Sequence, residues 1–394
     1  MKYISLEEIC NFIRNGVSIK QFENAGGFPI TRIETIANSF IDTNKVGYAD
    51  IYDLGKYEEY ILKNDDILMS HINSEKHLGK TAIYTDSGEK LIHGMNLLCL
   101  RVNKELINAK YLNYYFKTLN FKRQLPKITK KSVNQASFSV SDLKQLKIIV
   151  IDKTKQDKIV DILDKAQELI HKRKEQIGAL DELVKSRFIE MFGDPIKNHK
   201  KLAKAKLSDL GEWKTGGTPS RSNNEYYNGN IPWLSSGELN NKYCFSSNEM
   251  ITELAINESS AKIIAPGSLL LGMYDTAALK STINMIECSC NQAIAYSKLN
   301  DNLVNTIYIY YCIQIGKGFY KSQQRGVRQK NLNLSMVKGL EVLMPSLQLQ
   351  NQFADFVKQV DKLKFKMENS LKELEDNFNS LMQKAFKGEL FKED

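Results

Sequence analysis

Two long segments of the chain repeat apolar residues every three or four positions, with charged residues between them. In the first segment this series runs through Leu163, Ala166, Ile170, Ile177, Leu180 and Val184. In the second it runs through Val357, Val360, Met367, Leu371, Leu374 and Phe378. Such spacing is typical of the a and d positions of a coiled-coil seam. The pattern predicts two helices of about 36 residues, each about 54 Å long at a rise of 1.5 Å per residue.

These two segments belong to a repeat that covers most of the chain. When the sequence is shifted by 194 residues, Gln156 falls on Gln350 and Phe192 falls on Phe386, and the apolar register holds for more than fifty residues. Repetition at a fixed shift indicates a duplicated structural unit. Because neither helix has enough neighbouring chain to bury its seam alone, we expect the two helices to pack on each other. Packing of each helix on its own domain is the alternative.

About 150 residues of different texture precede each helical segment. Their apolar runs are short, as in 67–69 and 269–271, and Gly, Asn, Asp and Ser separate them. This texture is typical of short strands joined by turns. We therefore expect an α+β fold, in which two globular domains with twisted β-sheets are separated by two long antiparallel coiled-coil helices in a pseudo-two-fold arrangement. The expected segments are 1–151 (first globular domain), 152–193 (central helix), 194–206 (linker), 207–345 (second globular domain) and 346–390 (C-terminal helix).

Composition narrows the class of protein. The net charge of +9 is modest, so the distribution of the basic residues matters more than their sum. The six cysteines show no CxxC spacing and no clustered histidines, which favours reduced thiols over a metal or redox site. No apolar run reaches the roughly 18 residues of a membrane span, and the N-terminal residues lack the apolar region of a secretion signal. A cytoplasmic location without membrane contact is expected.

The basic residues gather in two segments that correspond under the same shift. Residues 116–131 contain six basic residues and no acidic one, and residues 316–330 contain five and none. Lysine neutralises phosphate, whereas Arg, Asn and Gln can pair with base edges, so nucleic-acid contact is favoured over a solvated face. The expected contacts are Lys122, Arg123, Lys127, Lys130, Lys131, Asn134 and Gln135 in the first domain, and Lys317, Lys321, Arg325, Arg328, Gln329 and Lys330 in the second.

Polar loops that follow strand-like runs are weaker candidates for the same role. His71 and Asn73 follow one such run in the first domain. Tyr274, Ser235 and Ser236 lie in comparable loops of the second domain. Each of these residue types also occurs in ordinary surface loops, and Trp233 beside Ser235 suits a protein core at least as well as base stacking.

Signatures of catalysis are missing from the sequence. Residues 211–218 have the glycines of a phosphate-binding loop but not its lysine. No Pro-Pro pair occurs, so the Asn-Pro-Pro-aromatic motif of base methylation is missing, and no glycine-rich S-adenosylmethionine loop follows a strand. Asp86, Glu89 and Lys90 suit a turn better than a nuclease site. We therefore expect neither a catalytic residue nor a metal site in this chain.

Several motifs resemble one family. Residues 216–220 read Gly-Gly-Thr-Pro-Ser, residues 231–235 read Ile-Pro-Trp-Leu-Ser, and Asn291-Gln292 follows them. Residues 345–352, which begin with Pro and are rich in Gln, resemble a Pro-x-x-x-Gln entry to a helix, and residues 381–390 resemble a terminal helical segment. In order and spacing these motifs are similar to those of Type I restriction-modification specificity (S) subunits, which have two target-recognition domains. The first half departs from the pattern with Asn15-Gly16 and 94–96, which suggests a divergent first domain.

The resemblance implies a non-catalytic, sequence-specific DNA-recognition subunit. Each globular domain would read half of a bipartite, asymmetric target in double-stranded DNA. The helices would set the spacer between the halves and dock two methyltransferase (M) subunits, which restriction-translocase (R) subunits join. S-adenosylmethionine, ATP and Mg would belong to those partners. Two other hypotheses stay open: a stand-alone nuclease or methyltransferase with an unrecognised site, and a coiled-coil scaffold that binds proteins.

Overall fold

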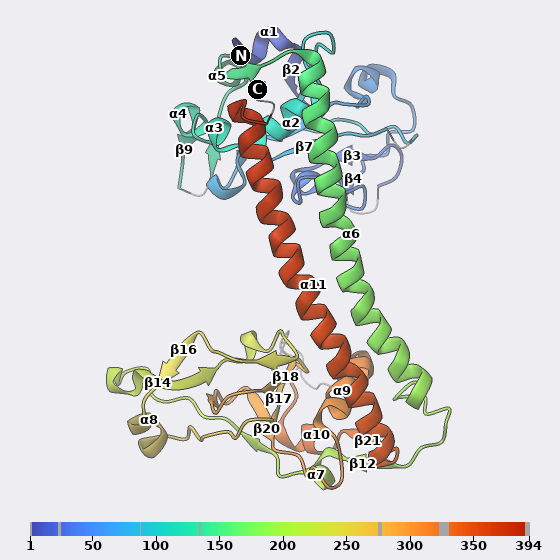
Figure 1. Cartoon of the computed structure of the whole chain (residues 1–394), viewed down its shortest axis with the longest axis vertical. Coiled ribbons are helices and arrows are strands. Elements are labelled where there is room, and N and C mark those ends of the chain that lie inside the picture. Colours follow the sequence, from blue (N-terminus) through green and yellow to red (C-terminus); the bar gives the residue numbers. More distant parts are fainter. Residues whose placement is uncertain are drawn as a thin grey trace. The chain divides into compact units, whose positions relative to one another are not determined.

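The computed structural model describes residues 2–22, 25–86, 88–133, 135–274, 278–322 and 331–390. The chain divides into two compact units, with Met1–Arg173 and Ser370–Asp394 in unit 1 and Lys174–Asn369 in unit 2. Each unit joins one globular domain to parts of both long helices, α6 (Lys153–Phe192) and α11 (Leu347–Lys387) (Figure 1). The expected mixture of helices and sheets is confirmed. In the described part of the chain, no helix combines the length and the apolar character that crossing a membrane requires.

An antiparallel sheet forms the centre of unit 1. Its strand order is β2-β8-β5-β7. The four strands are β2 (Cys10–Asn15), β8 (Leu97–Val102), β5 (Ile67–Ser70) and β7 (Thr81–Ile83). Every residue of β5 is buried, as expected for a central strand. Helix α2 (Ala109–Lys117) begins at Asn108, whose side chain accepts hydrogen bonds from two backbone N–H groups of its first turn, and it buries Tyr111, Tyr115 and Phe116.

The smaller elements of unit 1 surround this sheet. The strands are β1 (Lys2–Ser5), β3 (Ile30–Thr31), β4 (Val46–Gly47), β6 (Ile72–Asn73), β9 (Lys130–Lys131), β10 (Ala136–Ser137) and β11 (Lys147–Val150). The short α-helices are α1 (Leu6–Ile9), α3 (Leu119–Lys122), α4 (Leu125–Ile128) and α5 (Val140–Lys144). Single 3-10 turns are η1 (Ile33–Ile36), η2 (Gly55–Tyr60) and η3 (Glu75–His77). Strand β11 pairs with β1 and leads into α6.

Unit 2 contains a five-stranded sheet and a three-stranded sheet. The first has the order β13-β20-β17-β18-β15 and the second β16-β14-β19. Their strands are β13 (Lys214–Thr215), β14 (Tyr227–Leu234), β15 (Tyr243–Cys244), β16 (Glu249–Ile251), β17 (Leu269–Gly272), β18 (Ser281–Asn284), β19 (Ser289–Cys290) and β20 (Ile294–Ser297). A separate pair, β12 (Lys204–Lys206) with β21 (Glu341–Leu343), leads into α11. The helices are α7 (Leu207–Leu210), η4 (Asn224–Tyr226), η5 (Ser236–Glu238), α8 (Glu253–Glu258), α9 (Thr306–Ser322) and α10 (Leu334–Lys338).

The duplication is visible in matching buried hydrogen bonds. The side-chain oxygen of Gln156 on α6 accepts a hydrogen bond from the backbone N–H of Asn108 at 2.8 Å. Gln350 on α11 accepts the same bond from Asn305 at 2.9 Å. Each glutamine also donates its side-chain amide to the carbonyl five residues before it, at 2.8 Å and 2.9 Å. Both side chains are fully buried. The two units therefore attach a long helix to a globular domain in the same way.

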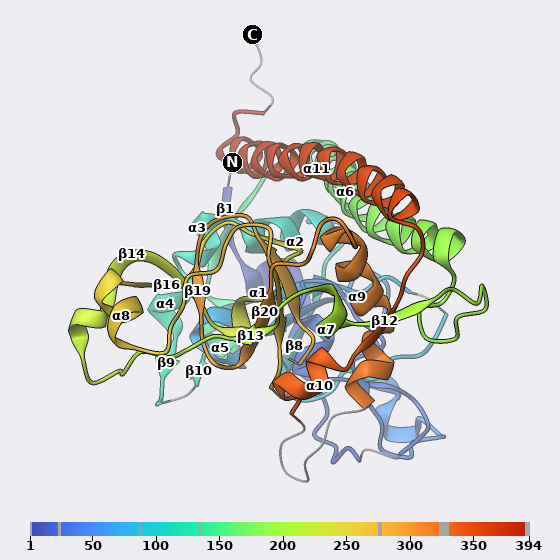
Figure 2. The same cartoon turned by 90° about the horizontal axis from the view of Figure 1, so that it is seen from below.

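Within each unit, the parts of α6 and α11 that belong to it pack side by side (Figure 1 and Figure 2). In unit 2, Phe353 of α11 contacts Phe188 and Phe192, with ring centroids 5.4 Å and 5.6 Å apart. Lys364 pairs there with Asp181 at 2.6 Å, so the two segments run antiparallel. In unit 1, residues of α6 share a buried cluster with Ala385 and Phe386 of α11.

Burial along the expected seam is uneven. Leu163, Ile170, Leu180, Val184, Val357 and Val360 are buried, whereas Ala166, Ile177, Met367, Leu371, Leu374 and Phe378 are half-buried. Phe188, outside the expected series, is fully buried. The helices span 40 and 41 residues, a little more than the length of about 36 that the apolar spacing predicts.

Candidate nucleic-acid interface

A small three-stranded sheet in unit 1 unites two polar segments that lie far apart in the sequence. Its order is β6-β10-β9. Ala136 of β10 pairs with Asn73 of β6 on one side and with Lys131 of β9 on the other. The weak loop candidate Asn73 and the basic segment therefore lie in one surface, a juxtaposition that the sequence did not indicate.

The β9–β10 hairpin presents its side chains to solvent. Lys130, Lys131 and Gln135 are exposed, and Val133 at the tip is 97% exposed. Both the backbone N–H and the hydroxyl of Ser132 donate to the Gln135 carbonyl, at 2.8 Å and 2.9 Å, which closes the turn. Asn134 lies outside the described residues. Lys131 pairs with Glu75 at 2.7 Å, with both side chains largely exposed, and such surface pairs are weak enough for another anion to replace.

Lys122, Arg123 and Lys127 precede this hairpin in the α3–α4 segment. All three side chains are exposed. Helix α3 begins at Thr118, whose hydroxyl accepts from the Phe121 N–H, and Phe121 is fully buried. The buried ring fixes the segment against the core, so the basic side chains are directed outward.

His71 is a core residue rather than a DNA contact. Its side chain is 5% exposed, and its Nδ1 lies 3.3 Å from the Phe138 carbonyl. Burial lowers the pKa of His71, while the Phe138 carbonyl opposes this shift. The expectation that His71 contacts DNA is therefore corrected: the side chain is buried against Phe138 and is not available at the surface.

In unit 2, the loop after β17 makes a pairing that corresponds to that of β6 with β10. Tyr274 forms a β-bridge with Asn331, and the Leu332 N–H donates to the Met273 carbonyl at 2.8 Å. In unit 1, Phe138 donates to His71 at 3.1 Å in the equivalent bond. Tyr274 is 40% exposed, consistent with a surface position. Arg325, Arg328, Gln329 and Lys330 lie outside the described residues.

Lys317 and Lys321 lie in the last turns of α9. Burial lowers the pKa of Lys317, and the charges of Lys321 and Lys280 lower it further. Lys317 is therefore near both Lys321 and Lys280. Lys280 precedes β18, and nothing in the sequence groups it with residues of α9.

Three of the motifs on which the family resemblance rests, those at 216–218, Trp233 and 291–292, stabilise the fold of unit 2. The Gly217 N–H donates to the Cys290 carbonyl at 2.9 Å, and Thr218 and Gln292 join through their side chains. A Cβ on Gly216 would lie 2.2 Å from the Cys290 oxygen, so only glycine fits there. Trp233 is buried, and its indole N–H donates to the Gly217 carbonyl at 3.0 Å. This cluster holds three segments together beneath the surface.

Unit 1 has the same close approach of two backbone segments, formed by different residues. A Cβ on Gly16 would lie 2.1 Å from the Gly94 oxygen, and the Val17 N–H donates to the His93 carbonyl at 2.9 Å. Asn15-Gly16 and Gly94 thus meet as 216–217 and 290–291 do in unit 2. In unit 2, the Ser235 hydroxyl donates to Glu238 at 2.8 Å, so it serves a turn, while Ser236 begins η5 and is half-buried.

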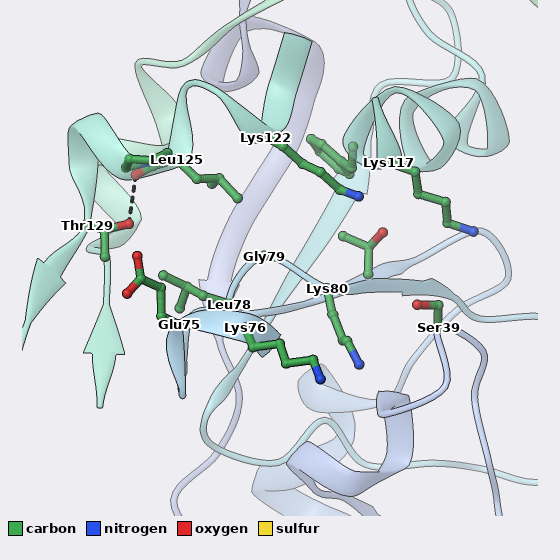
Figure 3. Close-up of a pocket in the computed structure, with 13 residues that line it drawn as sticks. Ser39, Glu75, Lys76, Leu78, Gly79, Lys80, Lys117, Lys122, Leu125 and Thr129 are labelled. Atoms are coloured by element: carbon green, nitrogen blue, oxygen red, sulfur yellow. Dashed lines mark hydrogen bonds between the residues drawn. The ribbon is translucent and has the colours of Figure 1, made fainter. Parts of the chain in front are cut away.

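A basic cavity of about 440 Å³ lies beside the hairpin in unit 1 (Figure 3). Lys76, Lys80, Lys117 and Lys122 line it. Glu75 is the one acidic lining residue among those that the structure describes. Sequence reasoning selected only Lys122 of this set. Lys117 lies within the basic run, but Lys76 and Lys80 come from a segment of ordinary composition, which only the fold brings to this place.

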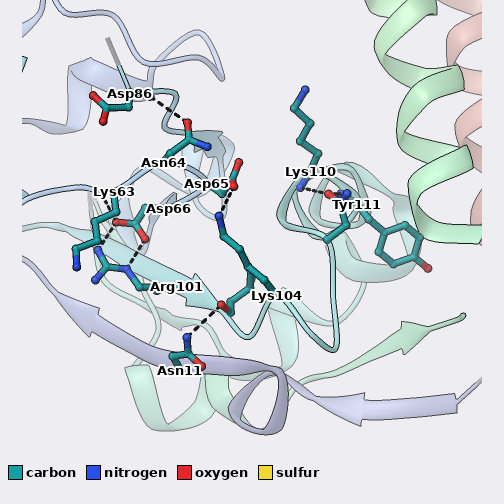
Figure 4. A network of polar contacts seen from close by, with 12 residues as sticks. Asn11, Lys63, Asn64, Asp65, Asp66, Asp86, Arg101, Lys104, Lys110 and Tyr111 are labelled. Atoms are coloured by element: carbon teal, nitrogen blue, oxygen red, sulfur yellow. Dashed lines mark hydrogen bonds and ion pairs between the residues drawn. The ribbon is translucent and has the colours of Figure 1, made fainter. Parts of the chain in front are cut away.

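Two neighbouring acidic residues of unit 1, Asp65 and Asp66, form ion pairs with basic residues of the same unit (Figure 4). Asp66 is 1% exposed and receives two hydrogen bonds from Arg101, at 2.8 Å and 2.6 Å. Asp65 pairs with Lys104 at 2.5 Å. Among the residues that the structure describes, no three His, Cys, Asp or Glu side chains are grouped as metal ligands. These carboxylates are neutralised by cations of the fold, which is a structural role.

Comparisons with known proteins agree with the duplicated plan. A family model for the type I restriction modification DNA specificity domain matches residues 1–179 and 199–376. A putative type I restriction enzyme specificity subunit of Methanocaldococcus jannaschii is 30% identical over 376 residues, which cover 91% of this chain and 86% of that protein. A specificity subunit of Escherichia coli is 25% identical over 163 residues, or 40% of each protein.

Solved structures share the fold at low sequence identity. A chain from a type I restriction-modification system has a TM-score of 0.60 at 14% identity, covering 99% of this chain and 98% of that one. The S subunit from M. genitalium has a TM-score of 0.53 at 13% identity, covering 98% and 96%. Because the specificity domain occurs twice and spans most of the sequence, the chain belongs to the type I restriction-modification specificity family, as a DNA-recognition subunit that is not itself catalytic.

Proposed function

We propose that the two globular domains each read one half of a bipartite, asymmetric target in double-stranded DNA. The observation that carries this proposal is the duplicated surface. In both units, residues that follow the basic segment in the sequence pair with the loop after a buried central strand: Ala136 and Ser137 with Asn73 and Ile72, and Asn331 with Tyr274. The scaffold is the same, whereas the loops differ in sequence. Two equivalent surfaces with different side chains suit a target with two different halves.

Within each surface we assign two kinds of contact. Lys122, Lys127, Lys130 and Lys131 of unit 1, with Lys317, Lys321 and Lys330 of unit 2, would neutralise phosphates. Arg123, Gln135, Asn134 and Asn73 of unit 1, with Arg325, Arg328, Gln329 and Tyr274 of unit 2, would face base edges. Ser235, whose hydroxyl is bound to Glu238, and Ser236 are weaker members.

The long helices would fix the spacer and dock two methyltransferase subunits, which restriction-translocase subunits join. Half-sites about one helical turn, or roughly 34 Å, apart would suit two domains of one chain. Leu169 of α6 and Leu363 of α11 are equivalent under the 194-residue shift and are 54% and 45% exposed. Equivalent exposed leucines support two copies of one partner. S-adenosylmethionine, ATP and Mg would be bound by the partners.

A salt series of DNA binding tests this proposal. We expect the purified chain to bind duplex DNA with a logarithmic affinity that falls steeply as the logarithm of salt concentration rises, because lysines displace counterions from phosphates. Addition of S-adenosylmethionine or Mg²⁺ to the chain alone should give neither methylated nor cleaved DNA. Affinity that is independent of salt would indicate a protein scaffold instead, and turnover by the chain alone would indicate an enzyme.

A further inference from the structure

Three separate segments direct lysines into the unit 1 cavity. Lys76 belongs to η3, Lys80 follows the turn at Gly79, and Lys117 and Lys122 end helices α2 and α3. In Figure 3 the ammonium groups of Lys76 and Lys80 point to the same side of the cavity, and those of Lys117 and Lys122 lie on its other side. Lys80 is held in place because its Nζ donates to the Ala37 carbonyl at 2.9 Å. The fold therefore concentrates positive charge around this cavity.

Carboxylates compensate this charge only in part within the described residues, through Glu75 at the cavity wall and Asp164 near Lys117. None of the four lysines forms an ion pair there, and Glu75 is engaged by Lys131 at 2.7 Å. Burial lowers the pKa of Lys117. The negative charge of Asp164 opposes this shift, and the positive charge of Lys122 lowers the pKa further. Like charges that share a partly desolvated site repel one another. A bound anion would remove this repulsion.

Unit 2 repeats the central lysine of the site. The Ser70 N–H donates to the Lys80 carbonyl at 2.9 Å, and the Gly272 N–H donates to the Lys280 carbonyl at 2.8 Å. The residue before each lysine has a left-handed backbone conformation, with φ of 72° at Gly79 and 56° at Leu279. A leucine rarely adopts this conformation. The same turn thus delivers a lysine to the same place in both units.

The helix that supplies the other lysines is also repeated. Lys280 interacts electrostatically with Lys317 of α9, as does Lys321. Helix α9 corresponds to α2, since Tyr308 donates to the Leu343 carbonyl at 2.8 Å as Tyr111 donates to the Ile149 carbonyl at 3.1 Å. None of the three unit 2 lysines forms an ion pair within the part of the chain that the structure describes. The turn that carries Lys80 and the helix that carries Lys117 thus each have a counterpart in unit 2.

We propose that each unit holds one phosphate-binding site, formed by Lys80 with Lys76, Lys117 and Lys122 in unit 1 and by Lys280 with Lys317 and Lys321 in unit 2. This inference rests on the proposed DNA-reading function, and it assigns the ligand as a phosphodiester group of the DNA backbone. The unit 1 site adjoins the β9–β10 hairpin through the Glu75–Lys131 pair. A backbone phosphate held there would fix the register of the duplex while the hairpin faces the bases.

Single-charge variants test the site in the full chain. Lys80→Gln and Lys280→Gln should each weaken binding about threefold to tenfold, equally for target and scrambled duplexes, because a phosphate contact carries no sequence information. Each variant should also reduce the slope of log affinity against log salt by about 0.9. Fluorescence anisotropy between about 50 and 200 mM salt measures both quantities. Lys76→Gln, at an exposed position, repeats the test if Lys80→Gln lowers the melting temperature.

Lys104→Gln is the matched control. It removes the same charge from unit 1, but Lys104 is paired with Asp65 outside the cavity, so it should leave affinity and slope nearly unchanged. Lys80→Arg should retain both. If Lys80→Gln and Lys76→Gln behave like the control while wild type binds DNA steeply, the inference is overturned and the proposed function stands. If wild type shows no salt-dependent binding, the proposed function itself fails.

A small phosphate ligand is the other source of the same chemistry. Calorimetry with inorganic pyrophosphate distinguishes it from the DNA backbone. We expect only weak, millimolar binding, because an open cavity that serves a duplex offers few directed donors to a free ion. Micromolar pyrophosphate binding that Lys80→Gln abolishes, with DNA affinity unaffected, would assign the cavity to a free ligand and overturn the inference.

Discussion

At the scale of single residues, burial decides which polar side chains can act. His93 is 1% exposed, and its Nε2 lies 2.9 Å from the Leu97 carbonyl, to which it donates as a neutral ring. Burial lowers the pKa of His93 to about 4. Its Nδ1 has no hydrogen-bond partner among the described residues. A proton on this nitrogen would place an unpaired charge in the core of unit 1.

His93 should therefore make stability depend on pH. Its pKa is about 4 when folded and near 6.5 when unfolded, so the unfolded state binds more protons between these values. The free energy of unfolding should be highest above pH 6.5 and should fall by about 3 kcal/mol as pH drops to 4. Urea titrations at several pH values measure this, and His93→Gln should lose that part of the dependence. An unchanged dependence in the variant would contradict the assignment.

The residues of the candidate sites could be predicted from the sequence where the local composition is unusual. They could not be predicted where only the fold brings residues together. The basic runs at 116–131 and 316–330 stand out because they lack acidic residues. Lys76, Lys80 and Lys280 do not, since each sits among mixed neighbours and joins its site through a turn. Conversely, His71 has the chemistry of a DNA contact, but its side chain is buried against Phe138.

At the scale of elements, base reading and phosphate binding are expected together in the α3–α4 segment and the β9–β10 hairpin that follows it. Lys127 and Gln135 are both exposed, and they differ in charge. Lys127→Gln should weaken binding to every duplex by a similar factor and reduce the salt slope. Gln135→Ala should weaken binding to the target by about 1–3 kcal/mol and leave scrambled DNA unaffected. Competition assays with target and scrambled duplexes separate the two effects. If Gln135→Ala lowers the affinity for both duplexes equally, Gln135 does not read a base.

A partly buried ion pair anchors the unit 2 sheet to α11. Lys242, next to β15, lies 2.5 Å from Asp361, and the Tyr243 hydroxyl donates to the same carboxylate at 3.1 Å. Burial lowers the pKa of Lys242, while Asp361 opposes this shift. Removing the carboxylate leaves a half-buried ammonium without its partner.

We expect Asp361→Asn to destabilise unit 2 by about 2–4 kcal/mol, toward the lower end because the side chains retain some exposure. Asp355→Asn, which removes the same charge from an exposed pair with Lys358 on the same helix, should cost less than about 0.5 kcal/mol. Thermal unfolding measures both. Equal effects of the two substitutions would show that the pair does not anchor the sheet.

Helices and strands could be predicted from the sequence where their apolar residues recur at regular spacing. The long helices follow from apolar spacing, since a seam of that length has few alternatives. Their ends and the burial of Phe188 depend on contacts with α9, as in the 5.6 Å stacking of Phe188 on Tyr308. The β6-β10-β9 sheet was not predictable, because its strands have two residues each and their pairing is set by the surrounding fold.

At the scale of the whole molecule, duplication is the central feature. The 194-residue shift in the sequence, the two matches to one domain model and the repeated glutamine bonds all describe it. The glycine-rich motif varies between the halves, yet the backbone crossing at Gly16 and Gly216 is kept. Duplicated scaffolds with different loops are what a split, asymmetric DNA target requires.

Methylation mapping tests this account most directly. The full chain would be co-expressed with its methyltransferase partner in a host without other adenine methylation, and the modified bases would be located by long-read sequencing. The account predicts methylated adenines at one asymmetric motif made of two specified halves and an unspecified spacer. Replacing residues 207–345 by the corresponding domain of a relative should change one half only. Methylation at no bipartite motif would contradict the account.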